Sequence, residues 1–484
     1  MNLLPLKTQK IRAELFSLGK KYVIMIFNAN IISRKEGDGL LKRSFKGGVH
    51  PLSRTHEGKY LTRNKASQPF SPEYVCIPMN LHLGAPSEPC VSKGDTVKLG
   101  QVIATPVGFL GLPIHATCSG EVVDVSEKQQ LGPKKVMCIT IKNDGLDTRE
   151  DCLPDIGTCA TAAPKDIVER IKQAGICGMG GAAFPLHVKL MIQDEKHADT
   201  IILNGAECET HLTSDFRTML ESPEDIVNGL VAIMRAMDSE NGIIAIEDNK
   251  PEAIAEMKKA VEGHTGIKVV ALKTKYPQGS EKQLITVTTG REVPRGKLPI
   301  DCGVIVTNVA TAAAVKAAIE DGLPLTHRIT TVTGRVKNPC NLYVPIGTVV
   351  KDMIEFAGGY EGSIAKLVAG GMMTGPAAPN DDFSVTKAMG GIVALNAKEA
   401  ISYEEKPCIR CARCASVCPM GLNPARIKQY CDANDMAGAK ENNVMDCIVC
   451  GCCSFTCPAN RFLTAAFKNM KDRITLASRL GGKK

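Results

Sequence analysis

Residues 408–419 read CIRCARCASVCP and residues 447–458 read CIVCGCCSFTCP, so both stretches follow the pattern C-x2-C-x2-C-x3-C-P. Three closely spaced thiolates can bind one face of a cubane iron–sulfur cluster, while the fourth cysteine of such a run ligates the neighbouring cluster. The duplicated pattern therefore predicts two [4Fe–4S] clusters in a helical, ferredoxin-like domain, which we place at residues 395–475.

The predicted ligand sets cross between the two stretches because each fourth cysteine turns away from its own run. One cluster is expected to have the ligands Cys408, Cys411, Cys414 and Cys457. The other is expected to have the ligands Cys447, Cys450, Cys453 and Cys418. The alternative is a pair of structural zinc sites, although zinc modules usually pair two C-x2-C halves across a longer loop. The remaining cysteines, Cys431 and Cys452 among them, are expected to be small buried side chains.

The composition of the 484 residues bounds the other possibilities. It is 44% hydrophobic and 23% charged with 44 Gly and 27 Pro, which is typical of a globular protein of three or four domains. The net charge of +8 is scattered and aromatic residues are only 4%, which disfavours nucleic-acid binding and favours a negatively charged protein partner. Twenty cysteines without an export signal indicate metal or redox use in a reducing compartment.

The N-terminal residues are not expected to anchor the chain in a membrane. The apolar run Tyr22–Phe27 is far shorter than the roughly 20 residues that a spanning helix needs, and no longer run follows, so we expect no transmembrane segment. Residues 1–44 are interpreted as a flexible leader, within which Met25 is an alternative start.

A glycine-rich loop follows an expected helix at residues 166–174. Residues 175–185 read GICGMGGAAFP, and closely set glycines let backbone N–H groups approach a phosphate or a flavin ring. The loop does not fit the dinucleotide fingerprint or the P-loop, so a bare tight turn is the alternative. It is followed by Lys189 and a buried-strand pattern at residues 200–203 that ends in NGAECE, residues 204–209. Polar groups at the carboxyl end of such a strand are where open α/β sheets bind ligands.

Two further motifs complete this region. Residues 276–284 read YPQGSEKQL, and the strand pattern at residues 303–308 continues into NVAT, residues 308–311. The order of the four motifs resembles the flavoprotein subunit that binds FMN and NADH in respiratory complex I. With the paired cysteine motifs downstream, the chain resembles the C subunits of the Rnf family of ion-translocating electron-transport complexes, from about residue 45 to residue 471.

The resemblance implies a multidomain α/β and β fold. We expect a lipoyl-like barrel-sandwich hybrid at residues 45–150, a Rossmann-like α/β domain for FMN and NADH at residues 160–322, and a β-grasp (SLBB) domain at residues 325–376. The first of these lacks a lipoyl-bearing Asp-Lys-Ala hairpin, so it is interpreted as a docking or packing module. Its histidines, His50 and His115, are expected to be structural.

The resemblance also implies roles for individual residues. The expected FMN-binding residues are Gly178, Gly180, Gly181, Ala182, Lys189, Asn204, Asn308 and Thr311, with Lys189 at the phosphate. The residues expected at the nicotinamide or ribose, and hence at the chemistry, are Glu207, Glu209 and Glu281. The chain departs from the family at Ala183, where a second Gly is usual, at Leu186 for Thr and at Thr210 for Pro, which puts the nucleotide site in question.

These inferences lead to one predicted function and two alternatives. The prediction is a peripheral oxidoreductase subunit on the cytoplasmic side of the membrane, which moves electrons between NADH, FMN and two clusters with membrane subunits and a ferredoxin-like protein as partners. The first alternative is a soluble flavin and iron–sulfur reductase that feeds a cobalamin or amino-acid reductase. The second is a two-cluster carrier whose flavin site has decayed.

Overall fold

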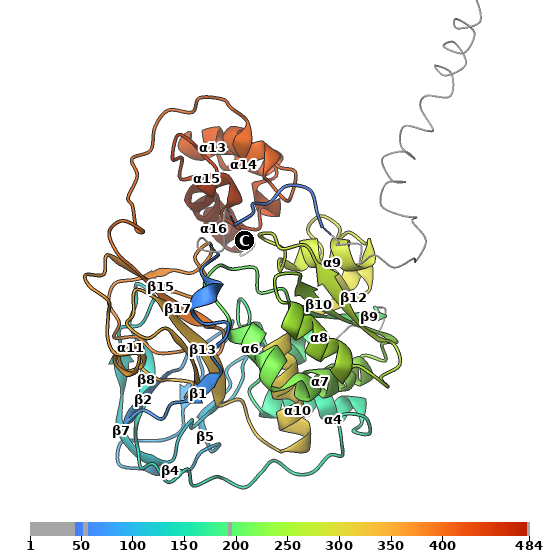
Figure 1. Cartoon of the computed structure of the whole chain (residues 1–484), viewed down its shortest axis with the longest axis vertical. Coiled ribbons are helices and arrows are strands. Elements are labelled where there is room, and N and C mark those ends of the chain that lie inside the picture. Colours follow the sequence, from blue (N-terminus) through green and yellow to red (C-terminus); the bar gives the residue numbers. More distant parts are fainter. Residues whose placement is uncertain (1–43, 52–56, 192–195, 482–484) are drawn as a thin grey trace, which may run out of the picture. The chain divides into compact units, whose positions relative to one another are not determined.

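The computed structural model describes residues 44–51, 57–191 and 196–481. The apolar run Tyr22–Phe27, the alternative start at Met25 and residues 1–43 of the predicted leader lie outside the described residues. Four sheets, the helices that pack on them and a C-terminal group of helices make up the described part of the chain (Figure 1).

Two small antiparallel sheets form the first region. One has the order β2-β8-β7-β4 and consists of β2 (Tyr74–Pro78), β4 (Thr96–Val97), β7 (Gly120–Lys128) and β8 (Val136–Asn143). The other has the order β3-β5-β6 and consists of β3 (Glu88–Pro89), β5 (Val102–Thr105) and β6 (Ile114–His115). Val75, Val122 and Ile141 are fully buried in the core of this region. At Gly120 (φ 144°) a Cβ atom would lie 1.9 Å from the Lys142 carbonyl oxygen, so only glycine permits this approach of β7 to β8.

A parallel sheet in the order β11-β10-β9-β12 forms the second region. Its strands are β9 (Thr200–Gly205), β10 (Asn241–Glu247), β11 (Ile267–Leu272) and β12 (Val304–Asn308). They are rich in Ile and Val because helices cover both faces. Ile201 and Leu203 pack in the core with α4 (Pro164–Gln173), α7 (Pro223–Ala236) and α10 (Val309–Glu320). Ile202, on the opposite face, packs with α9 (Glu281–Thr289). The short helices of this region are α5 (Leu186–Leu190), α6 (Ser214–Glu221) and α8 (Pro251–Ala260).

The third region is a six-stranded mixed sheet in the order β1-β14-β13-β17-β15-β16. Its strands are β1 (Ser67–Pro69), β13 (His327–Gly334), β14 (Cys340–Pro345), β15 (Lys366–Ala369), β16 (Ala377–Ala378) and β17 (Gly391–Leu395). Helix α11 (Val350–Phe356) packs on this sheet. Strands β1, β16 and β17 come from outside the predicted segment 325–376, and β1 pairs in parallel with β14.

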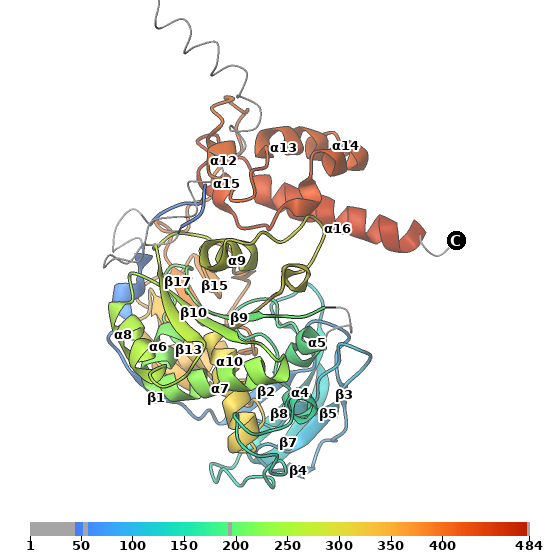
Figure 2. The ribbon, with the colours of Figure 1, turned by 90° about the vertical axis from the view of Figure 1, so that its right-hand side faces the viewer.

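Four short helices and one helix of 19 residues, α16, form the described C-terminal region. They are α12 (Arg413–Ser416), α13 (Pro424–Asp432), α14 (Met436–Glu441), α15 (Cys452–Phe455) and α16 (Leu463–Gly481). The buried residues Leu463, Phe467, Met470 and Ile474 recur at helical spacing along α16, so one face of this helix forms the core beneath α13 and α14 (Figure 2).

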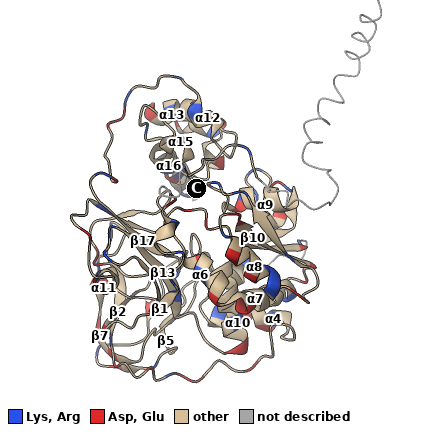
Figure 3. Ribbon diagram, viewed as in Figure 1, with Lys and Arg blue, Asp and Glu red and all other residues tan. Residues whose placement is uncertain are grey.

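Figure 3 shows Lys and Arg interspersed with Asp and Glu along the ribbon. Within the described residues, no helix has both the length and the apolar character required to cross a membrane.

Candidate functional site

The glycine loop is closed at its base and fixed to α10. Cys177 and Pro185 form an antiparallel bridge, and the Gly178 N–H donates to the Phe184 carbonyl at 2.9 Å. The Met179 N–H donates to Oγ1 of Thr311 at 2.9 Å. Residues 178–184 therefore project from a fixed base at the N-terminus of α10.

Two asparagines at the carboxyl ends of adjacent strands face this loop. Asn204, in β9, donates from Nδ2 to the Gly279 carbonyl at 2.8 Å. Asn308 ends β12 and caps α10, because its Oδ1 accepts from the Ala310 N–H at 2.9 Å. Its Nδ2 donates to Oδ2 of Asp215 at 2.8 Å, so its amide orientation is fixed from both sides.

A cavity of about 330 Å³ lies where these elements meet loops from the β-grasp sheet. Six of the predicted site residues line it: Gly180, Gly181, Asn204, Glu207, Glu209 and Asn308. The opposite wall comes from residues 369–376 and 386–390. A larger residue on either wall would displace a side chain of the site, because a Cβ at Gly180 would lie 2.7 Å from Nδ2 of Asn308 and one at Gly371 would lie 2.2 Å from Cδ of Glu209. Exposed backbone flanked by amide and carboxylate groups fits a flavin, whose polar edge needs donors and acceptors.

The other five predicted residues are not among those that line the cavity. Gly178 and Thr311 act at the base of the loop, and Ala182 is exposed on it. Lys189 and Glu281 are brought together instead, with Nζ 3.1 Å from Oε1. Lys189 also donates to the Val306 carbonyl at 2.8 Å.

The two glutamates of the NGAECE motif have different surroundings. Glu207 is buried and accepts from the N–H of Asp215 at 2.8 Å, which places its charge at the N-terminus of α6. Glu209 accepts from the Met373 N–H at 2.9 Å and from the Thr374 hydroxyl at 2.5 Å. Glu209 thereby joins the strand end of the α/β sheet to the β-grasp loop across the cavity.

Lys59 is a site residue that the sequence motifs do not reveal. Its side chain is buried, and Nζ donates to the carbonyls of Glu207, Glu209 and Leu212 at 2.9, 2.9 and 2.6 Å. Lys59 therefore fixes the loop that carries both glutamates, across about 150 residues of sequence. No local pattern could have indicated this contact.

Two further charged residues beside the cavity were also missed. Burial, together with the charge of Glu207, raises the pKa of Asp215 to about 6. Burial lowers the pKa of Arg328 to about 10, and its guanidinium donates to the carbonyls of Met179 and Lys387 at 3.1 and 2.5 Å. Arg328 thus connects the glycine loop to the β-grasp domain.

The family departure at Ala183 has a local explanation. Ala183 has a φ of 52°, a left-handed conformation that glycine adopts readily and that costs other residues about 1 kcal/mol. Its carbonyl accepts from the Leu83 N–H at 3.0 Å, and the residue does not line the 330 Å³ cavity. The methyl group of Ala183 therefore raises the conformational energy of the backbone and does not obstruct the cavity.

The two cysteine stretches adopt the same local conformation. Arg410 and Val449, at equivalent positions, have φ of 57° and 56°, and each donates its N–H at 3.4 Å to the sulfur of the cysteine two residues earlier. Ala412 and Gly451 are equivalent and left-handed as well, and each precedes a short helix, α12 or α15.

The cysteines fall into two groups. Four of the predicted ligands line one small cavity: Cys418, Cys447, Cys450 and Cys453. In the other group, burial raises the pKa of the Cys414 thiol, and the nearby Cys457 and Cys408 raise it further. The neighbours found in each group are those that the crossed ligand sets require, and the four thiols around the small cavity suit a cubane cluster. Cluster binding itself remains a prediction.

The two groups differ in exposure. Cys408 and Cys411 are exposed, whereas Cys453 and the spare Cys452 are buried. Within the described residues, no three His, Cys, Asp or Glu side chains have the spacing to hold a single metal ion.

The flavin-side cavity and the second cysteine group are joined by Tyr276. Its hydroxyl donates to the Cys450 carbonyl at 2.7 Å. Burial raises the pKa of this hydroxyl, and the nearby Glu209 and Cys208, which line the cavity, raise it further. The Gln283 side chain donates to the Pro419 carbonyl at 3.3 Å, so the YPQGSEKQL motif contacts both cysteine stretches.

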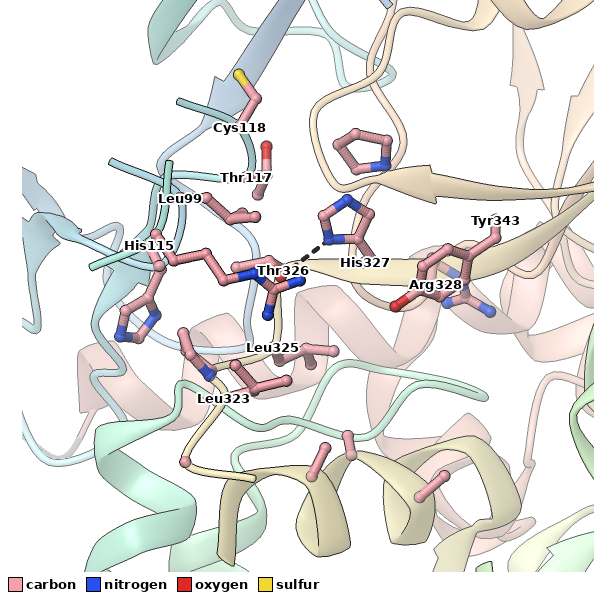
Figure 4. Close-up of a pocket in the computed structure, with 18 of the residues that line it drawn as sticks. Leu99, His115, Thr117, Cys118, Leu323, Leu325, Thr326, His327, Arg328 and Tyr343 are labelled. Carbon is pink, nitrogen blue, oxygen red and sulfur yellow. Dashed lines mark hydrogen bonds between the residues drawn. The ribbon is translucent and has the colours of Figure 1, made fainter. Parts of the chain in front are cut away.

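A larger cavity of about 770 Å³ lies elsewhere, between the barrel-sandwich strands, α10 and the start of β13 (Figure 4). The ring of His327 stacks on Tyr343 with 5.2 Å between centroids. Burial lowers the pKa of His115 to about 3 and that of His327 to about 4, so both imidazoles are neutral at pH 7. None of the predicted site residues lines this cavity, which is separated from the smaller one by Met179 and Arg328.

Comparison with known protein families matches three segments. Residues 43–146 match the RnfC barrel sandwich hybrid domain, residues 171–317 the Nuo51 FMN-binding domain, and residues 329–377 the SLBB domain. These matches and the observed sheets confirm the predicted multidomain fold class.

Related proteins match most of the chain. The C subunit of the proton-translocating ferredoxin:NAD(+) oxidoreductase complex of Clostridium ljungdahlii is 45% identical, over 84% of this chain and 88% of that protein. The C subunit of the Na(+)-translocating ferredoxin:NAD(+) oxidoreductase complex of Acetobacterium woodii is 42% identical, over 90% and 98%. The C subunit of the ion-translocating oxidoreductase complex of Rhodobacter capsulatus is 40% identical, over 89% and 83%.

Among solved structures, an NAD+-reducing [NiFe]-hydrogenase in the H2-reduced state is similar with a TM-score of 0.48 and 18% identity, over 65% of this chain and 61% of that chain. The identity and coverage of the three related sequences decide the family. The chain belongs to the family of C subunits of ion-translocating oxidoreductase complexes of the Rnf type.

Proposed function

We propose that this chain is the peripheral electron-input subunit of a membrane-bound, ion-translocating ferredoxin:NAD oxidoreductase, located on the cytoplasmic side of the membrane. Its partners would be the membrane subunits of the complex, a ferredoxin-like electron carrier and NADH. The names of the related proteins, which specify ferredoxin and NAD, support the reaction class.

The residues that would hold each cofactor follow from the two sites. FMN would lie in the 330 Å³ cavity, against the backbone of Gly180 and Gly181 and the amides of Asn204 and Asn308. Glu209 and Glu207 would face the nicotinamide from the same strand end. The eight cysteines would hold two [4Fe–4S] clusters in the crossed sets. When bound, flavin accepts a hydride as an electron pair and releases single electrons to one-electron carriers.

The observation that carries this proposal is the hydrogen bond between Tyr276 and the Cys450 carbonyl. The same motif that supplies Gly279 to the cavity wall supplies the buried Tyr276, which bonds to the loop of one cysteine group. This hydrogen bond holds the predicted nucleotide site and the predicted iron–sulfur site close together, as electron transfer between them would require. Lys189 donates to Glu281 and to the Val306 carbonyl, and the third N–H of its ammonium would meet the FMN phosphate, as the family resemblance implies.

The test is an anaerobic visible-absorption titration of the cluster-reconstituted protein with added FMN, in which NADH is added stepwise. Bleaching of both the flavin and the cluster bands is expected. If dithionite bleaches the clusters but NADH changes neither band, the chain is an electron carrier and its α/β domain is a scaffold. If NADH reduces the isolated chain and it then reduces a soluble cobalamin or amino-acid reductase directly, the soluble alternative is correct.

A further inference from the structure

Apolar and basic side chains surround the cysteine group that contains the exposed Cys408 and Cys411. Four large apolar residues around it are more than half exposed: Tyr403 (54%), Ile409 (66%), Phe455 (61%) and Phe462 (53%). Arg410 and Arg413 are exposed within the same cysteine stretch. We call these six residues the cluster-side patch.

Backbone contacts place the parts of the patch side by side. The Lys406 N–H donates to the Ala459 carbonyl at 2.9 Å, and the Phe462 N–H donates to Oε1 of Glu405 at 3.2 Å. Residues 405–411 therefore run alongside residues 457–462. Helix α12 also contacts α15, which ends at Phe455.

Comparison of the two cysteine stretches shows that the patch is specific to one of them. The backbone conformation is the same, yet Arg410 stands where the second stretch has Val449, and Arg413 stands where it has the fully buried Cys452. The second stretch is covered by Tyr276 and the flavin domain. The first stretch is contacted at its C-terminal end, where Gly48 and Gln283 donate to the carbonyls of Val417 and Pro419. At its N-terminal end it carries two exposed cations, Arg410 and Arg413, beside its predicted ligands.

We propose that the cluster-side patch is the docking surface for an acidic iron–sulfur protein, an inference that rests on the proposed function. Large exposed apolar groups rimmed by charge are typical of protein interaction sites. The positive charge of this region favours a negatively charged partner. Residues 401–481 contain eleven Lys and Arg against seven Asp and Glu, and the only charged residues of the patch are its two arginines. The exposed position of Cys408 and Cys411 places the predicted cofactor within reach of a redox partner.

The test measures binding and not turnover. The full chain, reconstituted with iron and sulfide, is titrated by calorimetry with a small acidic two-cluster ferredoxin at about 50 and about 200 mM salt, without NADH. We expect binding that weakens as salt rises. The double variant Arg410→Glu and Arg413→Glu is expected to bind about tenfold more weakly or worse. The matched control, Lys468→Glu and Arg479→Glu on exposed positions of α16, makes the same change in net charge and is expected to bind within about twofold of the wild type.

A second variant keeps the test decisive if the charge reversal lowers the iron content. Ile409→Ser retains both arginines, and it is expected to weaken binding without changing the salt dependence. Wild-type affinity in both variants, equal losses in the α16 control, or no binding of ferredoxin to the wild type at low salt would each overturn the proposal. Failure of NADH to bleach the wild type would instead contradict the proposed function and leave the binding result standing.

Discussion

At the scale of single residues, the distance between Gly180 and Asn308 controls access to the flavin-side cavity. A Cβ at position 180 would lie 2.7 Å from Nδ2 and 3.1 Å from Cγ of Asn308, whose amide also caps α10. We expect Gly180→Ala to displace this amide and to lower the affinity for FMN about tenfold or more while the iron content stays unchanged. Fluorescence titration of FMN and iron analysis measure the two effects.

Gly132 supplies the control for this substitution. It is exposed in a turn of the barrel-sandwich region, and a Cβ there meets nothing within 4 Å. Gly132→Ala should leave FMN affinity unchanged. Unaltered FMN affinity in Gly180→Ala would show that the flavin binds elsewhere.

Asp215 makes stability depend on pH. Its pKa is raised to about 6 in the folded protein by burial and by Glu207, so the folded chain retains a proton that the unfolded chain loses near pH 4. Its contribution to stability is present at low pH and is lost as the pH rises through about 6. Asp215→Asn cannot ionise and can still accept from Asn308. We expect the variant to be more stable than the wild type at pH 7.5, by on the order of 3 kcal/mol, with the difference vanishing near pH 4.

Chemical unfolding followed by circular dichroism at a series of pH values measures this difference. The control is Asp472→Asn, which removes an exposed carboxylate on α16 in place of a buried one. A stability difference for Asp215→Asn that is the same at every pH would contradict the assignment.

Residue types that carry their own signal could be predicted from sequence, and those whose role depends on distant partners could not. Gly180, Asn204 and Asn308 stand in recognisable motifs and line one cavity. Lys59 and Asp215 stand in no recognisable motif. A buried lysine bonded to three carbonyls cannot be distinguished by sequence from a lysine on the surface. Lys189 and Glu281 come from such motifs, yet their opposite charges pair with each other in the structure.

At the scale of elements, the crossing of the cysteine ligands joins two segments that are far apart in sequence. If the crossed sets are correct, Cys457→Ser should affect the same cluster as Cys414→Ser, and Cys418→Ser the same cluster as Cys453→Ser. Electron paramagnetic resonance of the dithionite-reduced variants would show two pairs of matching spectra. Uncrossed ligation would instead give Cys418→Ser the spectrum of Cys414→Ser.

Helices and strands with a local sequence pattern could be predicted. A strand that pairs with a distant part of the chain could not. The expected helix at 166–174 corresponds to α4, and the strand patterns at 200–203 and 303–308 correspond to β9 and β12. In contrast, β1 joins the β-grasp sheet beside β14, more than 270 residues later in the chain. A three-residue edge strand has no periodicity of its own, so only its partner makes it a strand.

At the scale of the whole described chain, Tyr276 holds the second cysteine loop against the flavin domain. Tyr276→Phe retains the ring but removes the donor to the Cys450 carbonyl, at a cost of about 1–2 kcal/mol. We expect faster hydrogen–deuterium exchange in residues 447–453, with unchanged FMN and iron content. Reduction of the clusters by NADH should slow relative to reduction of the flavin, because the two sites are held together less firmly.

Tyr60→Phe is the matched control, since Tyr60 is half exposed. Exchange in residues 447–453 that is the same in Tyr276→Phe and Tyr60→Phe would show that other contacts hold the loop.

The described residues 44–51 and 57–69 contact three regions in succession. The Gly48 N–H donates to the Val417 carbonyl, Val49 and Tyr276 exchange two backbone hydrogen bonds, and β1 completes the β-grasp sheet. During translation Gly48 is released more than 360 residues before its partner Val417. These residues must therefore wait through most of translation before they can close over their partners, so maturation of the N-terminal and C-terminal halves is coupled. Iron insertion and final closure should accordingly be late, linked events, which pulse-labelling with limited proteolysis can follow.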